Sequence, residues 1–219
     1  MWHRDNLQAS LSVMPNNCAC FLQKGIHSFN RRIEKDESTG SIPHVFSGSF
    51  VWEIPAGTGR RWELKGWKNA VTGGWQLAGI LRVQSGSPIA VTQATNFNAF
   101  AGFGIQRPNR LGDTRLPSDE RSPARWFNTD AFSQAGPFAI GTSSRNPVTG
   151  PAYRTFDVML GKTFPIREQL RVEFRAEAFN VTNTPSLMNP DGSFGSAAFG
   201  TITRAFDPRV FELVLKAHF

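Results

Sequence analysis

The chain has 219 residues, which allows one ordinary domain with a sizeable core and at most two domains. Phe and Trp are abundant, with 19 and 6 residues against a single Tyr, and charged residues make up only 19%. This composition excludes a disordered chain, since disorder requires few aromatic residues and much charge. The sequence has no apolar run long enough for a transmembrane helix.

The net charge of +7 raises the question of a nucleic-acid partner. Basic residues alternate with acidic ones, and neither zinc-finger spacing nor the aromatic-Gly signature of an RNA-binding sheet occurs. We therefore expect no nucleic-acid binding, and an anionic lipid or lipopolysaccharide surface explains the charge equally well. The two cysteines, Cys18 and Cys20, are one residue apart, which suits neither a redox pair nor a zinc half-site. No metal and no cofactor are expected.

Residues 1–42 are predicted to be an irregular lead-in, and from residue 43 apolar and polar residues alternate, which predicts β-strands. The first strand is HVFSGSFVWEI. The second begins at Trp75 and extends through SPIAVTQ, with a bend at Gly86 and Pro88. Residues 95–152 break the alternation and predict a long loop. Such a loop is uncommon in a compact domain but usual on the outer side of a membrane barrel.

Alternation resumes at YRTFDVMLGKTF (153–164) and, after a turn at 165–167, continues in EQLRVEFRAEAFN (168–180). The two runs predict an antiparallel hairpin. Pairing Phe164 with Glu168 makes the apolar faces of the two strands coincide, and the charged faces as well. A fifth predicted strand, VFELVLKAHF, closes the sequence.

The predicted strands that follow the long loop each have an apolar face and a charged face. The residues expected to face lipid are Leu160, Val172, Phe174, Phe211, Leu213 and Leu215. The residues expected to face the lumen of a barrel are Asp157, Arg171, Glu173, Arg175, Glu177, Glu212 and Lys216, with Asp157 opposite Arg175. The charged face is interpreted either as the wall of a solute path or simply as a solvated, charge-paired surface.

An antiparallel sheet with one apolar face fits a soluble β-sandwich as well as a membrane barrel. Loop lengths favour the membrane, because the connections 55–72 and 165–167 are short whereas 95–152 and 182–207 are long. In a sandwich the apolar face would be enclosed by residues of the same chain. The two hypotheses therefore differ in whether Leu160, Phe174 and Leu213 are covered.

Aromatic residues gather near one end of the predicted strands, as expected at a membrane interface. Trp52, Trp75 and Phe164 are the predicted interface aromatics. Lys162 lies on the apolar side of its strand, and its place near the turn allows its ammonium group to reach the interface. The final strand ends on Phe219, a further aromatic residue at this end.

Six segments in sequence order carry a resemblance to a known family: GGWQLAGILRVQSGSPIAVT, RPNRLGD, WFNTDAF, GPAYRTFDVMLGKTFPI, RVEFRAEAFNVTNTP and FGTITRAFDPRVFELVLKAHF. Over residues 43–219 the chain resembles the C-terminal end of TonB-dependent outer-membrane receptors of the Oar-like, carboxypeptidase-regulatory-domain type. The fold that the resemblance implies is all-β. It is an antiparallel meander of long strands from the C-terminal part of a transmembrane β-barrel, with long external loops.

The resemblance also implies a function at the bacterial outer membrane, where the full-length receptor takes up a carbohydrate, peptide or siderophore-like ligand. Phe219 would then belong to the signal read by the barrel assembly machinery. The implied partners are outer-membrane lipid and lipopolysaccharide, that machinery, and the TonB complex through N-terminal regions that this sequence does not show. Five predicted strands are fewer than the roughly 8 of a closed barrel, so we expect a fragment that is inactive alone.

No catalytic constellation is found. The four histidines are scattered, no GxSxG elbow occurs, and neither GTGRRW nor GFGIQR completes a dinucleotide fingerprint. We therefore expect no enzymatic activity. The alternative function is that of a soluble β-sandwich adhesion or carbohydrate-binding module. Within the long loop, WFNTDAF (126–132) is predicted to be an aromatic anchor that folds the loop onto the barrel.

Overall fold

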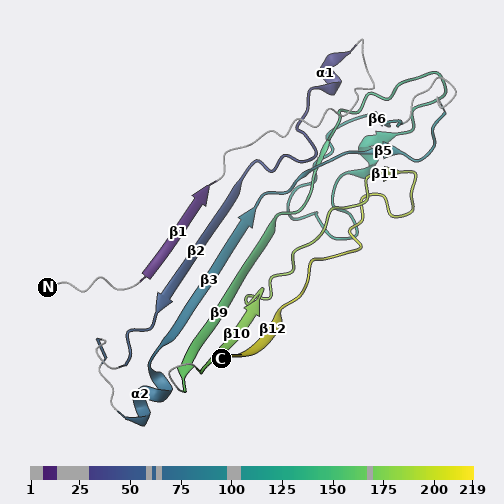
Figure 1. The fold of residues 1–219 in the computed structure, drawn as a ribbon. Helices are drawn as coiled ribbons and strands as arrows, with labels where there is room; N and C mark the ends of the chain where they lie inside the picture. Colours follow the sequence, from purple (N-terminus) through teal and green to yellow (C-terminus); the bar gives the residue numbers. More distant parts are fainter. Residues whose placement is uncertain (1–6, 14–29, 58–60, 63–65, 98–104, 167–169) are drawn as a thin grey trace.

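The computed structural model describes residues 7–13, 30–57, 61–62, 66–97, 105–166 and 170–219. In this part of the chain the long strands form one antiparallel sheet, shown in Figure 1 as a single layer with a cap of loops at one end. The order of the strands in the sheet is β1-β2-β3-β9-β10-β12. Their bounds are Leu7–Val13, Val45–Glu53, Trp75–Gln84, Tyr153–Pro165, Arg171–Phe179 and Val210–His218.

The period-two pattern of each strand is kept in register across the sheet. Leu213 pairs with Ala176, which pairs with Leu160, and the row continues to Leu77 and Trp52. Because successive residues of a strand point to opposite faces, this register places these paired apolar residues on one face of the sheet. The fold is all-β, as predicted from the alternation, and every strand of this sheet is antiparallel to its neighbours.

Strand β1 corrects the expectation of an irregular lead-in at residues 1–42. Its seven residues pair with β2, from Leu7 opposite Trp52 to Val13 opposite Phe46. The described part of the sheet therefore has six strands rather than five. A signal for β1 was present, because Leu7, Ala9, Leu11 and Val13 alternate with Gln8, Ser10 and Ser12. A four-residue helix, α1 (Arg31–Glu34), also lies in this segment.

The hairpin of β9 and β10 forms as predicted, but its register was wrong by four residues. Phe164 pairs with Val172 instead of Glu168. The turn is longer than expected, since β9 ends at Pro165, β10 begins at Arg171, and the N–H of Ile166 donates to the carbonyl of Leu170 at 2.9 Å. An even shift keeps every side chain on its face, so the predicted separation of apolar and charged residues is kept.

The strands are staggered as well as paired. The row of paired residues that starts at Val214, the middle of β12, ends at Glu53, the last residue of β2. The middle of β2 is Ser49, so the displacement is four residues over the four neighbouring pairs from β12 to β2. One residue per strand, with about 3.3 Å per residue and about 4.8 Å between strands, corresponds to a tilt of about 35°. This is the tilt of strands in β-barrels.

The long loop predicted for residues 95–152 is present, and it folds with the other long connection into a cap. Short strand pairs hold it together: β4 (Pro88–Ile89) with β8 (Val148–Thr149), β5 (Thr92–Gln93) with β11 (Ser193–Phe194), and β6 (Asn109–Arg110) with β7 (Phe132–Ser133). A 3-10 turn, η2 (Thr129–Ala131), precedes β7. The pairing of β5 with β11 joins the two long connections to each other.

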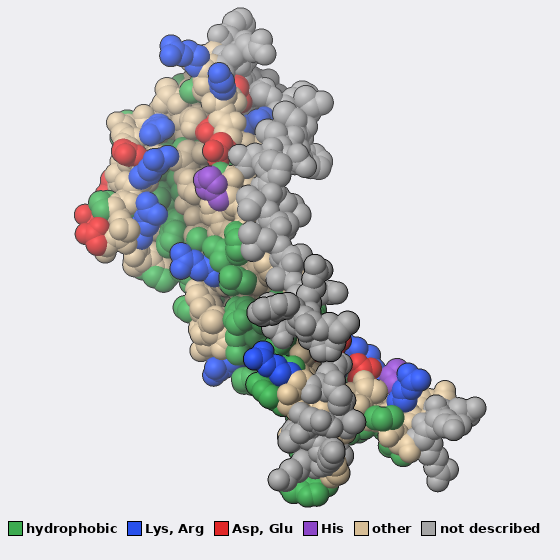
Figure 2. All heavy atoms as spheres, turned by 90° about the vertical axis from the view of Figure 1, so that its left-hand side faces the viewer, with side chains coloured by type: hydrophobic (Ala, Val, Ile, Leu, Met, Phe, Trp, Pro, Cys, Tyr) green, Lys and Arg blue, Asp and Glu red, His purple; other side chains and the backbone are tan. Residues whose placement is uncertain are grey.

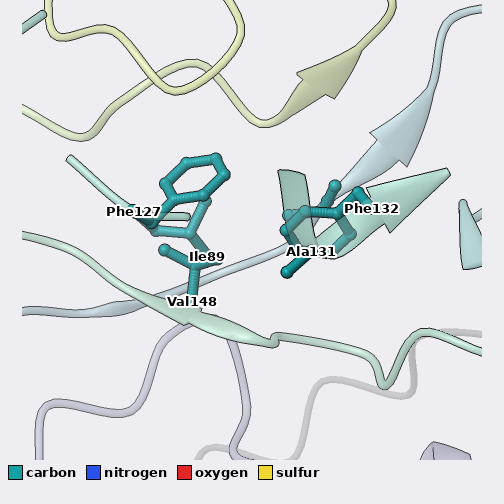
Figure 3. Packing of buried hydrophobic residues seen from close by; sticks show 6 residues of the cluster. Ile89, Phe127, Ala131, Phe132 and Val148 are labelled. Carbon is teal, nitrogen blue, oxygen red and sulfur yellow. The ribbon is translucent and has the colours of Figure 1, made fainter. Parts of the chain in front are cut away.

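The cap has an apolar core of its own, formed by Ile89, Val91, Phe127, Ala131, Phe132 and Val148. Figure 3 shows several of these side chains packed together from separate segments. Phe127 is 2% exposed, and its ring lies edge to face against Phe132 and Phe199, with centroids 6.0 and 5.2 Å away. The WFNTDAF segment is thus an aromatic anchor, but it does not fold the loop onto the barrel as predicted. It packs on other loop residues of the cap.

Gly86 marks the point where the chain leaves the sheet for the cap. A Cβ atom at this position would lie 1.8 Å from the carbonyl oxygen of Gly150. Only glycine allows the outgoing and returning segments to approach this closely. The second predicted strand accordingly ends at Gln84, and SPIAVTQ belongs to the cap.

The opposite end of the sheet carries short connections. The link between β2 and β3 contains the six-residue helix α2 (Trp67–Thr72), and residues 166–170 join β9 to β10. The C-terminus lies at this end, since His218 pairs with Arg171 at the start of β10 (Figure 1). Long and short connections therefore alternate between the two ends, as the loop lengths predicted.

Candidate functional site

The apolar face of the sheet is exposed, above all on β12. Leu213 is 73% exposed and Leu215 is 72% exposed, while Leu160, Val172 and Phe174 are partly covered by neighbours within the sheet. Among the described residues no second layer packs on this face. The sandwich hypothesis required Leu160, Phe174 and Leu213 to be enclosed by their own chain, and the structure does not show this.

The charged residues predicted to face a lumen share the other face. The register places Glu173 opposite Lys216 on β12 and opposite Thr163 on β9. The Glu173 carboxylate also forms an ion pair with Arg175 and contacts His218 Nε2 at 3.2 Å. The register places all seven residues that were predicted to face the lumen on this one face: Asp157, Arg171, Glu173, Arg175, Glu177, Glu212 and Lys216.

Two details of this charged face differ from the prediction. Asp157 was expected opposite Arg175, but Gly161 occupies that position because of the shifted register. Asp157 instead lies at the outer end of β9, where its Oδ1 accepts hydrogen bonds from Asn180 N at 2.8 Å and Thr155 Oγ1 at 2.9 Å. Glu177 lies directly opposite Glu212, a like-charge pair that destabilises a sheet.

The predicted interface aromatics lie at the end of the sheet away from the cap. Trp75 is the first residue of β3, and Phe164 and Trp52 lie next to the ends of β9 and β2. Trp75 packs edge to face on Phe174, with ring centroids 6.2 Å apart. Phe219 follows β12 at the same end and is 98% exposed.

Lys162 is held on the apolar face by contacts that the sequence did not predict. Its Nζ donates to the carbonyl oxygen of Val71 at 2.8 Å and lies 5.5 Å from the Trp75 ring centroid and 4.7 Å from that of Phe164. The indole N–H of Trp75 donates to the same carbonyl at 2.8 Å. The residue is only 5% exposed, so it binds the end of α2 to the sheet and does not extend freely.

A pocket of about 310 Å³ opens at the outer end of β9, β10 and β12. Its lining combines three aromatic rings with two carboxylates: Tyr153, Phe179, Phe206, Asp157 and Asp207. The Tyr153 and Phe206 rings lie edge to face with centroids 4.8 Å apart. Sequence reasoning assigned Asp157 to this face, but it missed the aromatic residues, which come from segments far apart in the chain.

A second, more polar cleft of about 560 Å³ lies within the cap, lined among others by Asp36, Arg110, Asp113, Arg115 and Asn146. Asn146 is 6% exposed and donates from its backbone N–H to Asp36 Oδ2 at 2.9 Å. Its side-chain amide donates to the carbonyl of Glu37. Figure 2 shows basic and acidic side chains interspersed over the cap.

The comparison with protein families decides the class of this sheet. Residues 14–212 match the outer membrane beta barrel domain. The chain belongs to this family. No curated protein and no solved structure matches the chain.

Family membership gives the faces of this outer-membrane β-barrel domain their environments. In transmembrane barrels apolar residues face the acyl chains, polar residues face the interior, and the longer connections are external. The cap of this domain is therefore external, and α2 and the connection between β9 and β10 lie at the periplasmic end. The alternation along each strand indicates which single residues face lipid, the lumen or the interface. These assignments stay predictions.

In the ranges that the structure covers, no group of three or more His, Cys, Asp or Glu side chains is placed to hold a metal ion. No helix in those ranges is long and apolar enough to cross a membrane. Cys18 and Cys20, whose lack of a role was predicted, lie outside the described residues.

Proposed function

We propose that this outer-membrane β-barrel domain is the C-terminal part of a TonB-dependent receptor of the Oar-like type. In the full-length receptor it would take part in the uptake of a carbohydrate, peptide or siderophore-like ligand. The observation that carries the proposal is the folded external cap, whose two long connections pack on each other through β5 and β11. A receptor needs such a shaped outer surface, whereas a barrel that serves only as a membrane anchor does not.

The sheet itself contributes the wall of the barrel. Its charged face carries acids and bases in contact, as with Glu173, Arg175 and His218, which suits a wetted interior. Its apolar face contacts outer-membrane lipid, and the basic residues of the cap contact lipopolysaccharide. Phe219 takes part in recognition by the barrel assembly machinery, because it is fully exposed at the periplasmic end of the last strand. Neither nucleic-acid binding nor catalysis belongs to the proposal.

Energy coupling is proposed to reach this domain only through N-terminal regions of the receptor. At the periplasmic end the described part of the link between β2 and β3 contains α2, and five residues separate β9 from β10. These connections are short, so we assign contact with the TonB complex to a plug and a TonB-contacting segment encoded elsewhere in the receptor. The domain alone is proposed to be inactive in transport.

Deletion of the native gene and its complementation test the proposal. We expect labelled ligand uptake by whole cells to require both this gene and an intact proton gradient, and a protonophore to abolish the gene-dependent part. Genomic DNA upstream of Met1 is expected to encode a signal sequence and a plug in frame. Gene-dependent uptake that persists after the protonophore would contradict TonB dependence while leaving the barrel assignment in place.

A further inference from the structure

We infer that the pocket at the outer end of β9, β10 and β12 binds a neutral carbohydrate. This inference rests on the proposed function for the fate of the ligand, and it narrows the substrate class of the receptor. The pocket of about 310 Å³ lies at the small end of the range for ligand pockets. It is suited to one end of a sugar chain.

The side chains that line the pocket combine aromatic rings with polar groups. Tyr153, Phe179 and Phe206 supply aromatic surfaces at the mouth of the charged face. The face of an aromatic ring is electron-rich and attracts the polarised C–H groups of a pyranose. Sugar hydroxyls both donate and accept hydrogen bonds, and the pocket offers the carboxylate of Asp157 as an acceptor and the guanidinium of Arg154 as a donor.

The carboxylate of Asp157 is fixed in place and keeps one oxygen available as a hydrogen-bond acceptor. Both hydrogen bonds that Asp157 receives end on Oδ1, from Asn180 N and Thr155 Oγ1. No described residue donates to its Oδ2. A carboxylate fixed through one oxygen keeps the other for a hydroxyl donor, and a charge-assisted hydrogen bond of this kind is stronger than a neutral one.

The residues around the pocket are held rigidly, and a preorganised site loses less conformational entropy on binding. Asn180 has φ of 49° and holds the 180–184 turn by accepting from Thr184 N at 3.1 Å and donating to Thr184 O at 3.2 Å. Ser186 is 6% exposed and exchanges hydrogen bonds with the backbone of Arg154 at 3.2 and 2.9 Å. The N–H of Phe206 donates to Ser186 O at 2.8 Å.

The net charge of the pocket disfavours anionic ligands. Asp157 and Asp207 line the pocket against a single guanidinium, that of Arg154. An anionic siderophore or an acidic peptide would therefore meet a net negative surface. A neutral sugar meets no such repulsion and finds the aromatic surfaces in addition.

Binding can be measured on outer-membrane vesicles from cells that carry the native gene, with vesicles of the deletion strain as background. The probes are fluorescently labelled maltotriose, cellotriose and xylotriose, with a sialylated trisaccharide and trilysine as anionic and cationic comparisons. We expect saturable binding of at least one neutral trisaccharide, with a dissociation constant at or below about 1 mM. Competition by purified lipopolysaccharide core oligosaccharide distinguishes a resident membrane glycan from a free one as the source.

Matched variants locate the binding site. Asp157→Asn and Phe179→Ala are each expected to weaken binding by about tenfold or more, because each removes a partner of the sugar. Glu177→Gln removes an acid from the same charged face but outside the pocket, and is expected to change affinity by less than about threefold. Heat-modifiable mobility in detergent confirms that each variant is folded.

Three results would overturn the inference: no neutral trisaccharide binds above background, the sialylated or cationic probe binds better, or Asp157→Asn and Glu177→Gln weaken binding equally. Failure of the proposed function looks different. Sugar binding that persists without any proton-dependent uptake would contradict the receptor role and leave the pocket assignment in place.

Discussion

Lys162 shows how a single charged residue is accommodated on an apolar face. A lysine in the middle of a bilayer costs about 2 to 4 kcal/mol, and this cost falls toward zero near the interface. Lys162 lies near the end of β9, and its Nζ contacts the carbonyl of Val71 and two aromatic rings. The contacts therefore outweigh a small desolvation cost, and they bind α2 to the sheet.

Replacing Lys162 by Met keeps most of the side chain but removes the hydrogen bond and the cation–π contacts. We expect the free energy of unfolding to fall by about 1 to 2 kcal/mol. Unfolding by denaturant in lipid vesicles measures this, with Lys216→Met on the charged face as the control. A variant at least as stable as the native chain would show that Lys162 carries a net cost.

Asp191 in the cap gives a residue-scale dependence on pH. Burial pushes the pKa of this carboxyl up, but the N–H of Ser193, at 2.9 Å, and the hydroxyls of Ser196 and Ser193 outweigh burial. Together they hold the pKa below its ordinary value of 3.8. A lowered pKa in the folded state means that the charged form stabilises the cap above about pH 4 and that this stability is lost as pH falls through the folded pKa.

The variant Asp191→Asn isolates this contribution. At about pH 6 we expect the variant to be less stable than the native chain, because the charged acceptor is missing. At about pH 2 the difference should be smaller, because below the unfolded pKa the stabilisation by the charged form declines as the pH falls toward the folded pKa. Denaturant unfolding of both proteins at the two pH values measures the change. A stability difference that is the same at both pH values would contradict the assignment.

At the scale of elements, β12 tests which face of the sheet meets lipid. Leu213 and Val214 are neighbours near the middle of the strand, but they lie on opposite faces. Leu213→Arg is expected to lower the free energy of unfolding in vesicles by about 2 to 4 kcal/mol, the cost of an arginine near the bilayer midplane. Val214→Arg faces the interior, where it lies opposite Arg175, and even with that like-charge pair it should cost no more than about 1 kcal/mol. Equal losses for the two variants would contradict the predicted lipid-facing residues.

The strands also show what local sequence can and cannot predict. The alternation of Phe174, Ala176 and Ala178 with Glu173 and Arg175 predicted the faces correctly, because side-chain direction follows from period two alone. The register depended on the length of the turn after Pro165, which no local pattern determines. The error was even, so the faces were right although the partners were wrong.

Other features of the sheet and the site depended on contacts between distant segments. β1 alternates too, but its signal is weak because Ala and Ser make up much of the strand and a polar segment follows it. The outer pocket could not be predicted, since Tyr153 of β9 and Phe206, which precedes β12, meet only after the sheet has brought these distant segments to its outer end. The acceptor of Lys162, Val71 O, belongs to a short helix that no pattern indicated.

At the scale of the whole molecule, the cap and the sheet are stabilised in different surroundings. Apart from Ala56, the buried apolar side chains of the described residues gather in the cap, whose core forms in water, whereas the sheet leaves its apolar face to lipid. The sequence predicted the long loops but not their folding into a cap, because β5 and β11 lie about a hundred residues apart in the chain.

Phe127→Ala tests whether the two parts are separable. Removing this buried ring is expected to destabilise the cap by about 3 to 5 kcal/mol. Protease added to intact cells should then cleave the cap faster, while heat-modifiable mobility shows that the strands still form a barrel. Loss of heat-modifiable mobility would instead show that the sheet depends on the cap.

The two outer strands of the sheet have a consequence for how the barrel closes. Every neighbouring pair from β1 to β12 is antiparallel, so these two strands run in opposite directions, and in the described residues neither has a partner on its outer side. Any further strands that bridge them in antiparallel fashion must be even in number, whether the same polypeptide or another provides them. A ring completed by an odd number would force one parallel contact at the seam.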